Sequence, residues 1–133
     1  MQALNHTRQE ILAERGAVAA QRWTRLRGLI GRSSLHESEG LLLLGTKAIH
    51  TIGMRFAIDV LFLDEDGRAI HLLHAFKPSQ ISPLIGRSAM VLELPAGTLE
   101  KTGTQVGDWI EVSLLNRAMA AAAGRLTDTG AGA

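Results

Sequence analysis

The chain has 133 residues, 46% of them hydrophobic, which is enough for one domain with its own core. Its 14 basic and 13 acidic residues give a formal net charge of +1, so any nucleic-acid or membrane partner would require a local charged patch. Cysteine is absent, which excludes disulfides, thiolate catalysis and cysteine-ligated metal clusters.

No targeting or membrane segment is evident. The polar stretch after Met1 lacks the apolar core of a signal peptide, and no run approaches the roughly 18 residues of a membrane helix. The sequence therefore predicts a cytoplasmic protein without a membrane partner. We expect a single β-rich domain over residues 1–115, followed by a short helix and a flexible tail over 116–133.

The N-terminal residues Ala3–Val18 allow two interpretations. Helix formers over residues 10–15 favour a helix, whereas the polar run Asn5–Gln9 between apolar flanks favours a β-hairpin. From Ala19 to Ile30 the pattern is helical, because apolar residues recur at three- and four-residue spacing.

The predicted helix and the residue pair after it carry four arginines: Arg22, Arg25, Arg27 and Arg32. A solvated helix face and an anion-binding site both explain this basic segment. Arg27 differs from the others because it lies four residues after Trp23 and flanks the buried stripe, where its guanidinium could reach a carboxylate.

The middle of the chain reads as a series of strands. Leu41–Leu44 is a short buried strand, and Phe56–Leu63 is an apolar run typical of a strand buried on both faces. The turn signal Asp66-Gly67 joins that run to a return strand, Ala69–Phe76, in a predicted antiparallel hairpin.

The loop Lys77–Ser88 contains proline and glycine, and we expect it to lie beside residues 49–64 and to vary in order with ligand. A strand, a helical turn and a last strand should follow: Ala89–Leu94, Leu99–Thr102 and Trp109–Leu115. Thr98 is the expected cap of the helical turn. The fold class is therefore mainly β, a small barrel-like domain with one helix in its N-terminal half and a short C-terminal helix.

Polar chemistry concentrates in residues 49–64. Asp59 is the one ionisable group within a buried apolar run, so it must accept hydrogen bonds or meet a counter-charge. Glu93 is a second carboxylate in an apolar setting, and a tight turn at Gly53 would let His50 fold back toward either acid. The candidate binding residues are His50, Thr51, Met54, Arg55, Asp59, Glu93, Arg27 and Lys77.

The two histidines His71 and His74 do not form a metal site by themselves. They are three residues apart on a predicted strand, so their side chains should point to opposite faces. The sequence identifies no cofactor and no metal ligand set.

Six blocks of residues carry a family resemblance, in this order along the chain: Arg25–Arg32, Glu39–Leu43, Ile49–Thr51, Gly53–Phe56, Ile58–Asp64 and Leu92–Thr98. Over about Ala3–Val112 the chain resembles the prokaryotic family named domain of unknown function 192. The resemblance implies a compact, mostly β domain that begins with a hairpin, and it implies no general activity. Many relatives have a cysteine where this chain has Thr46. The Gly107-Asp108 turn also resembles small cradle-loop barrels, some of which bind DNA.

Three functions remain open. The first is a small-ligand-binding or structural module with a polar site around His50, Asp59 and Glu93. The second is a hydrolase or lyase that uses His50 as a base oriented by a carboxylate. The third is a DNA-binding regulator that uses the segment Arg22–Arg32, against which the near-zero net charge and the 4% aromatic content count. The oligomeric state is left open.

Overall fold

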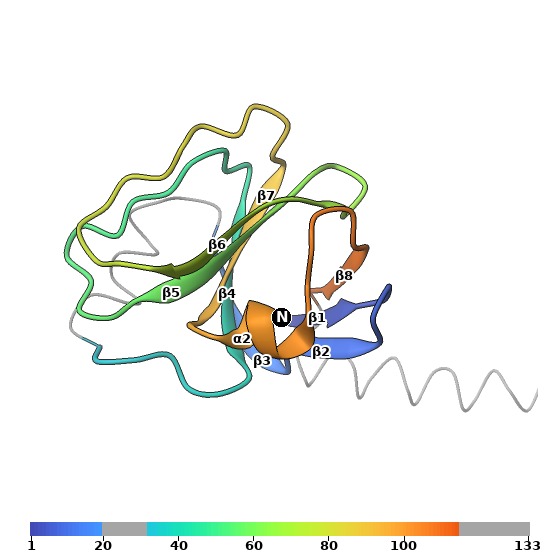
Figure 1. Cartoon of the computed structure of the whole chain (residues 1–133), viewed down its shortest axis with the longest axis horizontal. Helices are drawn as coiled ribbons and strands as arrows, with labels where there is room; N and C mark the ends of the chain where they lie inside the picture. The colour runs from blue at the N-terminus through green and yellow to red at the C-terminus, as the bar shows by residue number, and fades with distance from the viewer. Residues whose placement is uncertain (20–31, 115–133) are drawn as a thin grey trace, which may run out of the picture.

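The computed structural model describes residues 1–19 and 32–114, and within these ranges it contains eight strands and one short helix (Figure 1). The elements, with their bounds, are β1 Gln2–Asn5, β2 Glu10–Ala13, β3 Arg15–Ala19, β4 Glu39–Leu44, β5 Ile58–Leu63, β6 Ala69–Phe76, β7 Met90–Pro95, α2 Thr98–Thr102 and β8 Ile110–Ser113.

The described strands form two sheets. A three-stranded antiparallel sheet has the order β2-β1-β8, and a five-stranded sheet has the order β3-β4-β7-β5-β6, in which only β3 and β4 are parallel. The prediction of a mainly β domain is confirmed. A closed barrel is not, because each of these sheets has two edge strands.

Strand β5 lies inside the five-stranded sheet, between β7 and β6, and all six of its residues are buried. This burial explains its continuous apolar composition. Successive side chains of a strand point to opposite faces, so β5 supplies both cores of the protein. Leu61 and Leu63 belong to one core, and Ile58, Val60 and Phe62 belong to the other.

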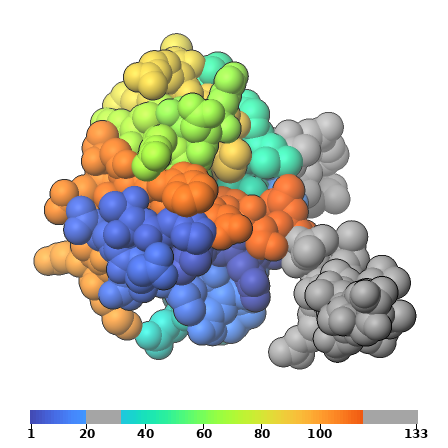
Figure 2. Space-filling model, turned by 90° about the vertical axis from the view of Figure 1, so that its right-hand side faces the viewer, coloured from blue at the N-terminus to red at the C-terminus, as the bar shows by residue number. Residues whose placement is uncertain are grey.

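The first of these cores, here called the hairpin core, lies between the two sheets. The N-terminal hairpin supplies Ala3 and Leu12, and the helix supplies Leu99. Figure 2 shows the outer side of this region, where the N-terminal hairpin in blue lies against the orange segment that contains β8.

The second, here called the loop core, lies on the other face of the five-stranded sheet. Ile49 and Met54, from the segment between β4 and β5, are buried against sheet residues such as Leu43, Phe62 and Val91. A long connection therefore covers this face, whereas β1, β2 and β8 cover the opposite one.

Both predicted hairpins are present. β1 and β2 pair in antiparallel fashion, with Leu4 opposite Ile11, as the family resemblance implied. β5 and β6 pair in antiparallel fashion across the turn at Gly67, whose φ of 84° suits glycine.

One strand was not predicted. β3, which the sequence analysis included in a hairpin or helix, pairs in parallel with β4, with Gly16 opposite Gly40. A Cβ atom on Gly16 would lie 1.9 Å from the carbonyl oxygen of Gly40, so only glycine permits this approach. The predicted helix Ala19–Ile30 lies outside the described residues except for Ala19, which ends β3. The predicted C-terminal helix also lies outside them.

The predicted cap of the helical turn is wrong. The residue at the N-cap of α2 is Gly97, with φ of 96°, and no side chain from the helix itself caps it. The Thr98 hydroxyl instead donates to the carbonyl of Pro95 at 2.8 Å. Gly103 ends the helix, since its φ is 69° and its N–H donates to the carbonyl of Glu100. In the described part of the chain no helix has the length and apolarity needed to cross a membrane.

Candidate functional site

Asp59 is completely buried and accepts three hydrogen bonds from backbone N–H groups. Its Oδ1 accepts from Ala75 at 2.8 Å, and its Oδ2 accepts from Gly97 at 3.1 Å and from Leu99 at 2.8 Å. The prediction that this carboxylate is buried and accepts hydrogen bonds or meets a counter-charge is confirmed, and backbone N–H groups are the donors. Asp59 therefore connects the end of β6 and the start of α2 to the central strand.

The donors explain why a carboxylate stands at this position. Ala75 has φ of 47°, a left-handed conformation that is unfavourable for alanine and that an accepted hydrogen bond helps to hold. Gly97 and Leu99 supply N–H groups at the start of α2, where a helix lacks internal acceptors. Asp59 thus performs the capping that the sequence analysis assigned to Thr98.

Glu93 is also completely buried, but on the opposite face of the sheet. Its partners across the neighbouring strands are Val60 and Leu41, which both belong to the loop core. Asp59 is paired with Leu94, which belongs to the hairpin core. The two predicted carboxylates therefore do not form one site, and Glu93 is the one that shares a face with the loop bearing His50.

Thr51 fastens this loop to the segment after β6. Its hydroxyl donates to the carbonyl of Lys77 at 2.7 Å and accepts from the N–H of Gln80 at 2.9 Å. Its own N–H donates to the carbonyl of Gln80 at 2.9 Å. Thr51 is completely buried, so these bonds replace the water that its polar atoms would otherwise contact.

The loop Lys77–Ser88 lies beside the first residues of the segment 49–64, as predicted. An isolated antiparallel bridge joins His50 to Ile81, and Ser82 exchanges two hydrogen bonds of 2.9 Å with the backbone of Ile49. The Ser88 hydroxyl donates to the carbonyl of Thr46 at 2.8 Å. The loop is therefore tied to residues 46–51 along its length and covers the loop core.

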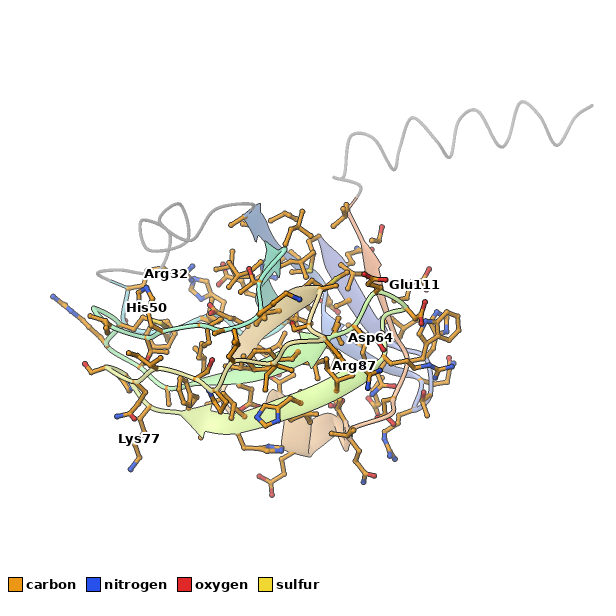
Figure 3. All side chains as sticks on the ribbon, turned by 90° about the horizontal axis from the view of Figure 1, so that it is seen from above. Arg32, His50, Asp64, Lys77, Arg87 and Glu111 are labelled. Carbon is orange, nitrogen blue, oxygen red and sulfur yellow. The ribbon has the colours of Figure 1, made fainter. Side chains whose placement is uncertain are left out.

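The remaining candidates differ in exposure. Met54 is buried in the loop core, whereas Arg55 and Lys77 are exposed. Figure 3 shows Lys77 at the same end of the molecule as His50. Arg27 lies outside the described residues.

Arg32, the last arginine of the basic segment, is held by Glu39. The guanidinium donates to both carboxylate oxygens, at 2.7 and 3.1 Å. Because of this hydrogen-bonded pair, the pKa of Glu39 falls to about 2, even though partial burial acts to raise it. The same pairing raises the pKa of Arg32. Glu39 also accepts the N–H of His36 at 3.0 Å, so the pair fixes the entry into β4.

Sequence reasoning missed a second buried polar cluster, formed by Asn5, Thr104 and Asp108. The Asn5 amide donates to Thr104 at 3.1 Å and to Asp108 at 2.9 Å, and the Arg8 guanidinium donates to Asp108 at 2.7 Å. Burial acts to raise the pKa of Asp108, but hydrogen bonds from Asn5, the backbone N–H of Gln105 and Arg8 hold it below the ordinary value. This cluster joins the first hairpin to the turn before β8. The Gly107-Asp108 turn is the sequence feature that could have drawn attention to this cluster.

The described residues do not form an evident metal site. Within residues 1–19 and 32–114, no three histidine, aspartate or glutamate side chains lie close enough together to hold an ion. A hollow of about 400 Å³ is lined by residues of the three-stranded sheet, among them Leu4 and Ile11. Another, of about 500 Å³, is lined by Lys47, Asp64 and Arg87, among others. The candidate residues around His50 line neither hollow.

Comparisons with known proteins support the fold. The family model of DUF192, described as "Uncharacterized ACR, COG1430", matches residues 3–112. None of the curated proteins compared with this chain matches it significantly.

Two solved structures are similar. A protein of unknown function from Novosphingobium aromaticivorans has 20% identity and a TM-score of 0.71, over 84% of this chain and 82% of its own. A Sinorhizobium meliloti protein, named a putative transcription regulator, has 25% identity and a TM-score of 0.67, over 83% of this chain and 89% of its own.

Proposed function

Since the chain belongs to the DUF192 family, whose description assigns no activity, we propose that it is a small-ligand-binding module with a polar site on the loop core. In this proposal Glu93 and His50 provide the polar groups, and Thr51 and Met54 shape the wall beside them. The ligand is a small polar molecule that enters where the loops 45–57 and 77–89 meet. Asp59 is not part of the site, because it caps α2 on the other face of the sheet.

The observation that carries this proposal is the position of Glu93. Its carboxylate has no exposed surface, and its strand neighbours Leu41 and Val60 are apolar. A completely buried carboxylate is uncommon in proteins, and buried ionisable groups are enriched at sites where they contact a ligand. The covering loop brings His50, a histidine, to the same side of the sheet.

Native mass spectrometry of protein purified from cells without denaturation tests the proposal. We expect the wild type to carry an additional mass that is released on unfolding, and we expect Glu93→Gln to lose it. Glu65→Gln is the matched control, because Glu65 is exposed in the turn between β5 and β6 and should keep the ligand. If the wild type and both variants have only the mass of the chain, the protein is not a module that retains a cellular ligand.

A second candidate is transcriptional regulation, which is favoured by the name of the Sinorhizobium meliloti protein of similar fold. DNA binding would then use the arginines of residues 22–32, of which Arg32 is engaged with Glu39. Fluorescence anisotropy with duplex DNA at several salt concentrations tests it. Phosphate contacts predict a steep loss of affinity with salt, whereas no binding at low salt would exclude this candidate.

A further inference from the structure

The loops that cover the loop core form an antiparallel ribbon with an inner and an outer face. We use the name loop ribbon for residues 49–52 and 79–82, which are joined by the bonds of Thr51 and Ser82 described above. Ile49, Thr51 and Ser82 are buried and form the inner face. Ile52 and Ile81 are exposed on the same two segments and form the outer face.

The outer face exposes large apolar side chains. Ile52 is 54% exposed and Ile81 is 73% exposed, and Leu84, two residues beyond the ribbon, is 75% exposed. Single exposed apolar residues are common on protein surfaces, but three on one pair of joined loops form a patch that water solvates poorly.

The same loops are basic. Residues 45–57 and 77–89 contain four of the 14 basic residues of the chain and none of its 13 acidic residues. Lys47 and Arg87 lie near Asp64, at the end next to the β5–β6 turn. Arg55 and Lys77 are exposed, and neither has an ion-pair partner among the described residues. Although the net charge of the whole chain is small, these loops therefore form a local surface that is both basic and apolar.

We propose that this surface docks on an anionic lipid bilayer. Ile52, Ile81 and Leu84 insert below the headgroups, while Arg55 and Lys77 stay at the level of the lipid phosphates. Interfacial membrane binding is strengthened both by apolar side chains that insert below the headgroups and by adjacent cations that attract anionic lipids. The inference goes beyond the proposed ligand site and does not depend on it.

The shape of the surface favours a bilayer over a protein partner. A peptide or helix is held in a groove, and Ile52, Ile81 and Leu84 line neither of the two hollows described above. The hydrogen bonds of Thr51 and Ser82 hold the ribbon in place, so docking orders little additional chain. Figure 1 shows these loops, in teal and olive, on the side of the molecule away from the three-stranded sheet, which would face water.

Sedimentation of the full chain with vesicles tests the proposal. We compare phosphatidylcholine alone with an equal mixture of phosphatidylcholine and phosphatidylglycerol, and we expect binding to the mixture that weakens with salt. Ile81→Ser and Leu84→Ser should each lower the partition coefficient about tenfold. Ile11→Ser is the matched control, because Ile11 is 58% exposed on the three-stranded sheet and should leave binding unchanged.

Charge variants separate the electrostatic contribution. Arg55→Gln with Lys77→Gln should reduce binding to the anionic mixture and flatten its salt dependence, whereas Arg68→Gln, on an exposed residue after the β5–β6 turn, should do neither. The proposal is wrong if the wild type does not sediment with anionic vesicles, or if Ile11→Ser weakens binding as much as Ile81→Ser. It is also wrong if Ile81→Ser only abolishes a dimer seen by analytical ultracentrifugation, which would make a second copy of the chain the partner.

Discussion

Replacing Asp59 by alanine should destabilise the protein strongly, because one carboxylate accepts three hydrogen bonds from two separate segments, the end of β6 and the start of α2. The substitution leaves the N–H groups of Ala75, Gly97 and Leu99 without their acceptor. Two of these donors begin α2, and the third belongs to a residue in a left-handed conformation. The substitution therefore loosens the end of β6 and the start of the helix together.

The expected magnitude follows from the donors. Each buried donor left without a partner costs about 1–3 kcal/mol, and water entering the vacated space recovers part of this. Asp59→Ala should then lower the free energy of unfolding by about 3–5 kcal/mol, a large part of the roughly 5–15 kcal/mol that is typical of a domain. Asp59→Asn keeps one oxygen, which can accept from Gly97 and Leu99, and loses only the bond from Ala75. Asp59→Asn should therefore lower the free energy of unfolding by about 1–3 kcal/mol.

Urea unfolding followed by circular dichroism measures both variants. We expect Asp59→Ala to lower the urea midpoint by about 2 M, given a denaturant dependence of about 2 kcal/mol per molar urea. Glu65→Ala is the control for losing an acidic side chain, because Glu65 is exposed in the turn after β5. A change below about 0.5 kcal/mol in Asp59→Ala would show that its hydrogen bonds do not stabilise the fold, and the structural role assigned to it would be wrong.

Three further predictions concern other polar groups. Because the pKa of Glu39 is depressed to about 2, its pairing with Arg32 should stabilise the fold fully above about pH 4.5 and lose this contribution as the pH falls toward 2. Both side chains are partly exposed, so the free energy of unfolding should fall by about 1–2 kcal/mol over this pH range. Unfolding measured at a series of acid pH values tests this, and Glu39→Gln should not show this decrease. Thr51→Val should accelerate amide hydrogen exchange in the loop 77–82 without changing exchange in β1, β2 and β8, and equal acceleration everywhere would contradict the local role. His71 has a buried Nε2 with no hydrogen-bond partner among the described residues, so His71→Leu should leave the melting temperature unchanged or raise it. His74→Leu is the control, because His74 is exposed. If His71→Leu alone lowered the free energy of unfolding by more than about 1 kcal/mol, the His71 imidazole would have a hydrogen-bond partner in the folded protein, and the prediction would be wrong.

Strong local patterns made much of the fold predictable. The apolar run ending at Leu63, the turn at Gly67 and the return strand Ala69–Phe76 define a hairpin whose pairing needs no information from the rest of the chain. The polar run after Asn5 also favoured the first hairpin, but helix formers over residues 10–15 left a helix open, and the family resemblance decided between the two.

Elements that depend on distant partners were not predictable. Three of the five residues of β3 are glycine or alanine, which form strands weakly, and β3 is a strand because Gly16 can approach Gly40 of β4. The capping of α2 depends on Asp59, which is 38 residues before Gly97. A local pattern suggested Thr98 instead, because side-chain caps usually come from the residue next to the helix.

The candidate site shows most clearly what register adds to a sequence pattern. Asp59 and Glu93 have the same appearance in the sequence, each an acid within an apolar strand. A strand reverses its faces with every residue, so the pairing register alone decides which core each carboxylate enters. Because Leu94, and not Glu93, lies opposite Asp59, one acid meets the backbone donors at the start of α2 and the other enters the core beneath the loop of His50. The two carboxylates therefore require separate explanations, and a functional role has to be sought at Glu93, not at Asp59.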